Sequence, residues 1–263
     1  MKRTITSIEG NSQKLDGGAM FGNAPRAMWQ RWIAPDEQNR IPLSCRTLLI
    51  QEENPKRYIL IETGVGAFFS PEMKERYGIQ ESNHCLIDNL ANVGVNQEDI
   101  DLVLLTHLHF DHAGGLLSEF REGEMPHLLF PNAKILVGEK QWERANDPHA
   151  RDRASYVPEV MNALKNCDRL EIIPEGSQSK TLGEGYHLSQ SSGHTPGQLI
   201  PEVQMPGGPV VFPADVIPGS HWVHLPITMG YDRYPEALID EKRDLLNDLV
   251  KRAGRVVFTH DPD

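Results

Sequence analysis

The chain has 263 residues, and its 26 Lys and Arg residues against 37 Asp and Glu residues give a formal net charge of −11. That length suffices for one large domain with a sizeable hydrophobic core, and the acidity argues against a nucleic-acid partner, because phosphate binding requires clustered basic residues. No stretch approaches the roughly 18 apolar residues that cross a bilayer, and the three cysteines are widely spaced, so we expect no membrane partner and a cytoplasmic protein.

Short apolar, β-branched runs alternate with amphipathic segments, which is typical of an α/β protein. Strands are predicted over residues 44–51, 57–62, 101–106, 134–137, 170–173, 209–212 and 255–259. Helices are predicted over residues 71–77, 85–93, 139–145, 157–164 and 235–253. No linker divides the sequence, so we predict one domain over residues 1–263, with a cap-forming insertion within residues 116–190.

The densest set of metal-ligating residue types follows the third predicted strand. His107, His109, Asp111 and His112 lie within six residues, and two glycines follow at 114 and 115. His107 and His109 project to the same side if the chain stays extended, and glycine lets the backbone turn closely. Imidazole and carboxylate groups suit zinc, iron or manganese, so this segment is a candidate metal site.

Three more candidate ligands lie downstream. His194 lies in the turn Gly193-His194-Thr195-Pro196-Gly197, Asp215 follows the apolar run VVFPA, and His260 follows VVFT. Each of these residues alone is also common in ordinary loops. Together they supply the ligands still missing for two metal ions. Three apolar runs end in candidate ligands (VLLTHLHFDH, VVFPAD and VVFTHD), which predicts that these ligands share one edge.

In this order, the HxHxDH motif, the GHTPG turn, the Asp and the final His resemble the metallo-β-lactamase-fold hydrolases. The resemblance implies a four-layer αββα sandwich. It also implies that one metal ion is held by His107, His109 and His194, and a second by Asp111, His112 and His260, with Asp215 bridging both. Two such ions can acidify a bridging water to hydroxide near neutral pH, and a ligand set without thiolate favours zinc, with iron, manganese and cobalt as alternatives.

The sequence departs from that family in two places. Glu62 occupies a position where the family usually carries an Asp, so it is a candidate for supporting the ligands, or else a solvated residue at a strand end. The tyrosine that lactonases tend to place shortly after the bridging Asp is missing, and His221 or His224 could supply a proton instead, beside the catalytic carboxylates Asp111 and Asp215.

These features indicate a dinuclear metal-dependent hydrolase of a small ester-like substrate, with a lactone favoured and acyl-homoserine-lactonase-like activity as the model. Phosphotriester or aryl-ester hydrolysis is the alternative on the same fold, as in methyl-parathion-hydrolase-like enzymes. A mononuclear-iron oxidoreductase similar to the persulfide dioxygenases and a non-catalytic binding module are the alternatives from other classes.

Several aromatic and Met side chains are candidates for an apolar substrate pocket or for a homodimer surface, although core packing is the ordinary role of these residue types. The candidates assigned to the pocket are Met20, Phe21 and Trp222.

Overall fold

The computed structural model describes residues 2–263, which divide into two compact units. Unit 1 comprises the segment up to Gln13 together with Ser44–Ile173, and unit 2 comprises Lys14–Leu43 and Pro174–Asp263. Each unit has its own sheet and its own apolar core. No helix within residues 2–263 has the length and apolar character needed to cross a membrane.

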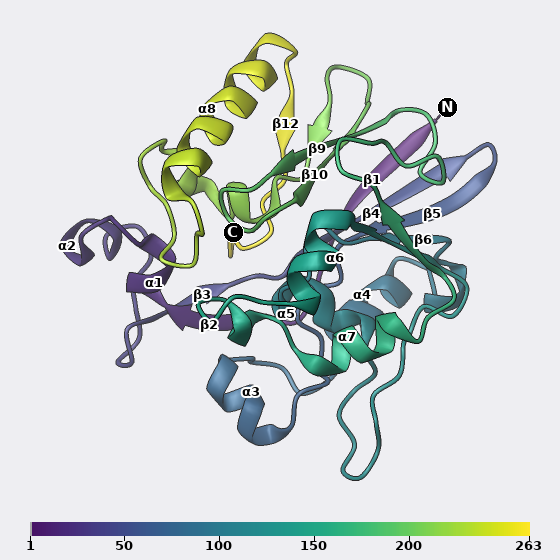
Figure 1. The fold of residues 1–263 in the computed structure, drawn as a ribbon, viewed down its shortest axis with the longest axis horizontal. Coiled ribbons are helices and arrows are strands. Elements are labelled where there is room, and N and C mark those ends of the chain that lie inside the picture. The colour runs from purple at the N-terminus through teal and green to yellow at the C-terminus, as the bar shows by residue number, and fades with distance from the viewer. Residues whose placement is uncertain (1) are drawn as a thin grey trace. The chain divides into compact units, whose positions relative to one another are not determined.

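The sheet of unit 1 has the strand order β1-β4-β5-β6-β7-β8 (Figure 1). Its strands are β1 (Arg3–Glu9), β4 (Arg46–Glu53), β5 (Lys56–Ile61), β6 (Leu102–Leu104), β7 (Lys134–Gly138) and β8 (Leu170–Ile173). β1, β4 and β5 pair antiparallel, whereas β5 to β8 run parallel, with Ile61 opposite Leu104. Since parallel strands end at one edge, the residues that follow β5 and β6 become neighbours there.

The helices of unit 1 contribute Leu86, Leu90, Val160 and Leu164, among others, to its apolar core. They are α3 (Pro71–Tyr77), α4 (Cys85–Asn92), α5 (Phe110–Ala113), α6 (Glu139–Asn146) and α7 (Pro158–Lys165). Single 3₁₀ turns cover Gln97–Asp99, Gly114–Leu116 and Arg153–Ser155.

Unit 2 contains a sheet in the order β12-β11-β10-β9 and the strand pair β2-β3. The strands are β2 (Gln13–Asp16), which begins at the last residue of unit 1, β3 (Arg40–Leu43), β9 (Tyr186–Ser191), β10 (Gln198–Val203), β11 (Val210–Val211) and β12 (Arg255–Val256). The helices are α1 (Gly17–Phe21), α2 (Arg26–Trp29) and α8 (Pro235–Lys251), with 3₁₀ turns at Ala214–Val216 and Ser220–Val223. β11 pairs antiparallel with β10 and parallel with β12.

The long helix α8, in yellow in Figure 1, runs alongside β12 and packs Leu238 and Leu249 into the core of unit 2. Its first turn contains Pro235, whose ring fixes a helical φ and whose missing N–H needs no partner there. One charged side chain on the helix, Lys242, is fully buried. Its Nζ donates hydrogen bonds to the carbonyl oxygens of Trp222 (2.9 Å), His224 (3.2 Å) and Ile227 (2.7 Å), which compensate for the loss of water.

The predicted α/β pattern is confirmed, and each strand and helix predicted from the sequence has a counterpart within a few residues. Whether residues 116–190 form a cap, and whether the whole chain acts as a single domain, stay predictions.

Candidate metal centre

In unit 1, the metal-ligand candidates of residues 107–112 leave the end of β6 and enter the short helix α5, whose N-cap is His109. The ring centroid of His107 lies 4.5 Å from that of His109 and 3.9 Å from that of His112. The three rings and Asp111 are buried. The sequence prediction that these side chains form one group therefore agrees with the local geometry of this loop.

Glu62 joins the group from the neighbouring strand end. Its side chain is 1% exposed, its Oε1 accepts a hydrogen bond from the Thr106 backbone N–H (2.8 Å), and its Oε2 lies 3.1 Å from Nδ1 of His112. Because a carboxylate only accepts, this contact favours a proton on Nδ1 and a lone pair on Nε2 of His112. A solvated Glu62 is thus excluded, and its side chain lies where it can orient a ligand.

Other side chains of unit 1 fix the same loop. Oγ1 of Thr106 lies 2.9 Å from Nδ1 of His107, and Nε2 of Gln13 donates to Oδ2 of Asp111 (2.8 Å). Oγ1 of Thr63 donates to the His112 carbonyl oxygen (2.9 Å). Contacts of this kind hold metal ligands in one orientation.

The glycines that follow the loop are required by close backbone packing. A Cβ at Gly115 would lie 2.0 Å from the Thr63 carbonyl oxygen, and one at Gly114 would lie 2.4 Å from that of Val65. Any larger residue would push the loop away from the strand end that carries Glu62.

In unit 2, sheet register brings His194, Asp215 and His260 to one edge. Val211 and Val256 are paired in the parallel strands β11 and β12, and Asp215 and His260 each follow four residues later (215 − 211 and 260 − 256). The β9–β10 turn that carries His194 lies at the same edge, because β10 runs antiparallel to β11. Of the three strand endings predicted to share an edge, the two that lie in this unit, at Asp215 and His260, do so.

The two carboxylate oxygens of Asp215 face different rings. Oδ2 lies 3.1 Å from Nε2 of His194, and Oδ1 lies 3.2 Å from Nε2 of His260. Asp215 is 5% exposed, and both rings are buried. One carboxylate is therefore positioned between two imidazoles, with one oxygen directed to each.

Asp232 is the residue that the sequence analysis did not assign. Its Oδ1 lies 2.8 Å from Nδ1 of His194, and its Oδ2 accepts a hydrogen bond from the Met229 backbone N–H (2.6 Å). Burial raises the pKa of the Asp232 carboxyl, and the His194 contact opposes that rise. Asp232 thus supports His194 in unit 2 as Glu62 supports His112 in unit 1.

Both groups lie beside a residue with unusual backbone geometry. Glu62 has φ 68° and Ala214, which precedes Asp215, has φ 44°. Residues other than glycine rarely adopt a left-handed φ, and such strain concentrates at functional sites.

The remaining predicted residues lie elsewhere in unit 2. Met20, Phe21 and Trp222 are buried in its core, where the Phe21 and Trp222 rings stack at 4.4 Å. The His221 ring stacks on Trp32, and His224 is exposed. Within residues 2–263 neither histidine forms a hydrogen bond or ion pair with Asp215, and their catalytic role, like a pocket role for the core residues, stays a prediction.

The donor chemistry of these groups fits a divalent metal ion. Ligand atoms of Glu62, His107 and His112 lie within 4.8 Å of one another, and every candidate offers an imidazole nitrogen or a carboxylate oxygen. Such donors suit borderline cations, of which zinc is the commonest in proteins with this ligand set.

Comparison with known proteins identifies the family. Residues 40–260 match the model of the "Metallo-beta-lactamase superfamily", which spans both groups of candidate ligands. The chain belongs to the metallo-β-lactamase superfamily.

Relatives of this superfamily member agree with that assignment. It is 25% identical to the N-acyl homoserine lactonase of Bacillus thuringiensis over 242 residues. The aligned region covers 86% of this chain and 83% of that protein. A probable metal-dependent hydrolase from Staphylococcus aureus has a TM-score of 0.86 at 29% identity, covering 99% of this chain and 91% of that one. AidC, a dizinc quorum-quenching lactonase solved with its product N-hexanoyl-L-homoserine, shares the fold with a TM-score of 0.77 at 17% identity, over 99% of this chain and 88% of that one.

The protein is thus a metal-dependent hydrolase of the metallo-β-lactamase fold, as the motif pattern predicts. The predicted similarity of the sequence to lactonases is also confirmed.

Proposed function

We propose that this superfamily member is a dinuclear zinc enzyme that hydrolyses small lactones, with an acyl-homoserine lactone as the model substrate. In this assignment the first ion is ligated by His107, His109 and His194, the second by Asp111, His112 and His260, and both by Asp215. The assignment follows the order of these residues in the sequence and the similarity to N-acyl homoserine lactonases about 25% identical.

The observation that carries the proposal is the position of Asp215. Its two oxygens are each directed at the Nε2 atom of a different histidine, at 3.1 and 3.2 Å, and those histidines are assigned to different ions. A carboxylate that bound only one metal ion would not need one oxygen directed at each of the two rings. When bound, a pair of divalent cations would polarise the substrate carbonyl and lower the pKa of water, so that a hydroxide nucleophile is available near pH 7.

The supporting residues of the chain then keep the ligands in place. The Glu62 carboxylate lies 3.1 Å from Nδ1 of His112, and the Asp232 carboxylate lies 2.8 Å from Nδ1 of His194. Both carboxylates therefore favour the tautomer that carries its proton on Nδ1. Nε2 of Gln13 donates to Oδ2 of Asp111 (2.8 Å) and so helps to orient this carboxylate. Each of these contacts lies within one unit.

An apolar groove in unit 1 favours a substrate with a hydrophobic chain. It has a volume of about 510 Å³ and is lined among others by Phe68, Phe69, Met73, Tyr77, Phe120, Tyr156 and Val157. The Tyr156 ring both lines this groove and contacts the His109 ring, with centroids 4.9 Å apart. We therefore propose that the acyl chain lies in the groove and that the lactone carbonyl lies toward His109.

A substrate panel on protein of measured metal content tests the function. Homoserine lactones with acyl chains of increasing length, an aryl ester, a thioester and a phosphotriester are compared by kcat/KM. We expect the lactones to have the highest kcat/KM and the longer chains to exceed the short ones, because they bury more apolar surface in the groove. A phosphotriester or aryl ester as best substrate would contradict the lactone assignment and favour the alternative hydrolase.

Metal stoichiometry tests the dinuclear assignment separately. Two zinc ions per chain are expected from elemental analysis of active protein. A single iron per chain, together with consumption of dioxygen and a persulfide substrate, would overturn the proposed hydrolysis and favour an oxidoreductase.

A further inference from the structure

In unit 2, one face of α8 carries the turn that contains His194. The N-cap Tyr234 and the helix residues Leu238 and Glu241 follow the i, i+4 and i+7 spacing of a single helix face. The backbone N–H of Tyr234 donates to the carbonyl oxygen of Gly193 (2.8 Å). A Cβ at Gly193 would lie 2.5 Å from Cα of Leu238, so the turn packs directly on the helix backbone. The position of His194 therefore depends on this face of α8.

Glu241 is a charged residue on that face. Its Oε2 accepts hydrogen bonds from Oγ of Ser191 (2.5 Å) and from the backbone N–H of Gly193 (3.1 Å). Its Oε1 accepts one from the backbone N–H of Ser192 (3.0 Å). The residues three positions before and four positions after Glu241 are leucines that pack in the apolar core of unit 2. A carboxylate in this otherwise apolar stripe is thus matched to three donors from one short segment.

The two backbone donors lie outside the sheet ladder. β9 ends at Ser191 and β10 begins at Gln198, so the N–H groups of residues 192 and 193 belong to the turn between the strands. Gly193 is buried, and apart from Glu241 its N–H makes a long contact with Oγ of Ser191 (3.3 Å). Successive backbone N–H groups that converge on one point form a site for an anion, and a buried N–H without an acceptor costs free energy. The Glu241 carboxylate supplies the anion here.

The segment that Glu241 holds leads directly into His194. The His194 ring is oriented by Asp232, whose Oδ1 lies 2.8 Å from Nδ1, and the His194 carbonyl oxygen accepts from the Arg233 backbone N–H (3.1 Å). The contact with Asp232 sets the rotation of the ring, whereas the contacts with α8 set the position of the backbone from which the ring projects. A displaced turn would move Nε2 of His194 away from Oδ2 of Asp215, which now lies 3.1 Å from it.

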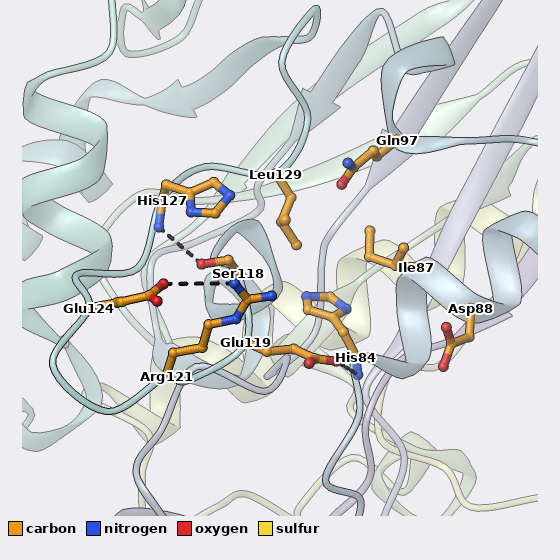
Figure 2. Close-up of a pocket in the computed structure, with 10 residues that line it drawn as sticks. All are labelled: His84, Ile87, Asp88, Gln97, Ser118, Glu119, Arg121, Glu124, His127 and Leu129. Carbon is orange, nitrogen blue, oxygen red and sulfur yellow. Dashed lines mark hydrogen bonds and ion pairs between the residues drawn. The ribbon is translucent and has the colours of Figure 1, made fainter.

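Unit 1 supports the glycines beside its ligands by a different contact. His84, the N-cap residue of α4, lines a pocket of about 280 Å³ together with Ser118 and Leu129 (Figure 2). Its Nε2 donates to the carbonyl oxygen of Gly115 (3.1 Å), since that oxygen can only accept. Unit 1 thus uses one hydrogen bond at this position, and unit 2 uses three to an acceptor that is a carboxylate. Hydrogen bonds to an ionised group are about twice as strong as neutral ones, so the support in unit 2 is the stronger.

We propose that Glu241 is a positioning residue of the metal centre, which holds His194 where a metal ion binds by accepting three hydrogen bonds from residues 191–193. This role rests on the proposed function only in assigning His194 to the first ion. Glu241 acts through the backbone and is not itself a ligand, because the convergent groups of metal ligands within residues 2–263 do not include it.

The zinc affinities of the full chain test the role of Glu241. Both affinities are measured by competition with a chromogenic chelator. Glu241→Leu keeps most of the side-chain volume but removes the acceptors, and should weaken the ion held by His194 by about 10–100-fold, as for other supporting contacts. Glu241→Gln keeps one acceptor oxygen and should weaken the same ion by about three- to tenfold. The other ion is the internal reference and should not change.

Two further readouts identify the affected ion. It should be the ion that Asp232→Asn weakens, since Asp232 also supports His194, and not the ion that Glu62→Gln weakens through His112. In protein loaded with Co²⁺, the visible absorption bands report the ligand geometry. Glu241→Leu should shift these bands.

The matched control is Glu202→Gln in β10 of the same unit. Glu202 is also a buried carboxylate, and its two oxygens accept from Nη1 (2.7 Å) and Nη2 (2.6 Å) of Arg252 rather than from the turn. Its loss should lower the free energy of unfolding, measured in urea, as the loss of Glu241 does. It should leave both zinc affinities and the Co²⁺ spectrum unchanged, which separates positioning from general stability.

Two results would overturn the proposal. One is a Glu241→Leu protein whose zinc affinities equal those of the wild type. The other is an equal loss of affinity in Glu202→Gln, which would mean that Glu241 only stabilises unit 2. If Glu241→Leu does not fold, Glu241→Gln decides by the same criteria.

Failure of the proposed function would look different. A wild type that binds a single ion would contradict the dinuclear assignment, and the role of Glu241 would then be decided by the affinity for that ion. Wild-type protein that binds two ions but does not hydrolyse lactones would contradict the substrate assignment and leave the zinc measurements valid.

Discussion

The two groups of candidate ligands are built in different ways. In unit 1 His107, His109 and His112 follow one another in a single loop, so local backbone geometry brings the His107 ring to within 4.5 Å of each of the other two. In unit 2 Asp215 and His260 are 45 residues apart in sequence (260 − 215), and the register of β11 and β12 brings them together. The first arrangement is set mainly by one loop, whereas the second depends on the pairing of two strands.

The largest expected effect comes from the residue that unit 2 places between two rings. Asp215→Ala should reduce kcat/KM by more than about 100-fold and release metal, since losing even a supporting residue costs 10–100-fold. Activity on a lactone and metal content by elemental analysis are the measurements. The control is Asp240→Asn on α8, an exposed carboxylate whose loss should leave both unchanged. Full activity in Asp215→Ala would contradict the bridging role.

Substitutions of the two supporting carboxylates, Glu62 and Asp232, compare the two units directly. Glu62→Gln and Asp232→Asn keep the side-chain volume but remove the negative charge beside His112 and His194. Each should weaken metal binding by about 10–100-fold, measured by competition with a chromogenic chelator. If only one variant lost metal affinity, the ligand histidine of the other unit would be oriented by packing alone.

The buried ammonium of unit 2 predicts a pH dependence of stability. Burial lowers the pKa of Lys242 from 10.5 to about 8, and Asp232 opposes the shift. Below about pH 8 both folded and unfolded chains are protonated there, so the cost of burying the charge is constant. Between about pH 8 and 10.5 the unfolded chain binds the extra proton, so the stability of the folded state rises with pH.

Comparing the wild type with Lys242→Met isolates the contribution of the buried amine to the pH dependence of the free energy of unfolding. Urea unfolding is measured at pH 7.0 and 9.5. Relative to the variant, the free energy of unfolding of the wild type should rise by on the order of 1 kcal/mol per pH unit above pH 8. An unchanged difference between the two proteins would mean that the three carbonyl contacts keep the amine protonated.

The smallest expected effect concerns backbone strain beside the ligands. Ala214→Gly removes the Cβ that disfavours φ 44° and should stabilise the protein by up to about 1 kcal/mol. Ala237→Gly in the exposed face of α8 is the matched control and should destabilise by about 1 kcal/mol, the ordinary cost of glycine in a helix. Two destabilised variants would show that residue 214 is not strained.

Sequence patterns predicted the buried parallel strands and the amphipathic helices well, because hydrophobic periodicity dominates there. They missed β1 and β9, whose polar residues RTITSIE and YHLSQS hide the pattern, and β10, which contains Pro201. β2 and β3 were missed because their pairing joins residues far apart in the chain.

The same contrast applies to the site. The HxHxDH segment is visible in the sequence because its ligands are adjacent, whereas His194, Asp215 and His260 gained meaning only from their order and the resemblance. Asp232 follows a turn rather than a strand, so its position gave no signal. The contact from Gln13 to Asp111 spans 98 residues and has no sequence signature.

The buried amine of Lys242 gives unit 2 a built-in chemical reporter. Acylating reagents attack amines that are both deprotonated and accessible, and a side chain held by the carbonyl oxygens of Trp222, His224 and Ile227 is inaccessible. Lys251, on the same helix, is exposed and will be labelled at once. The ratio of the two labelling rates, measured by mass spectrometry, therefore reports how often residues 222–227 separate from α8. Global unfolding experiments do not detect such a local opening.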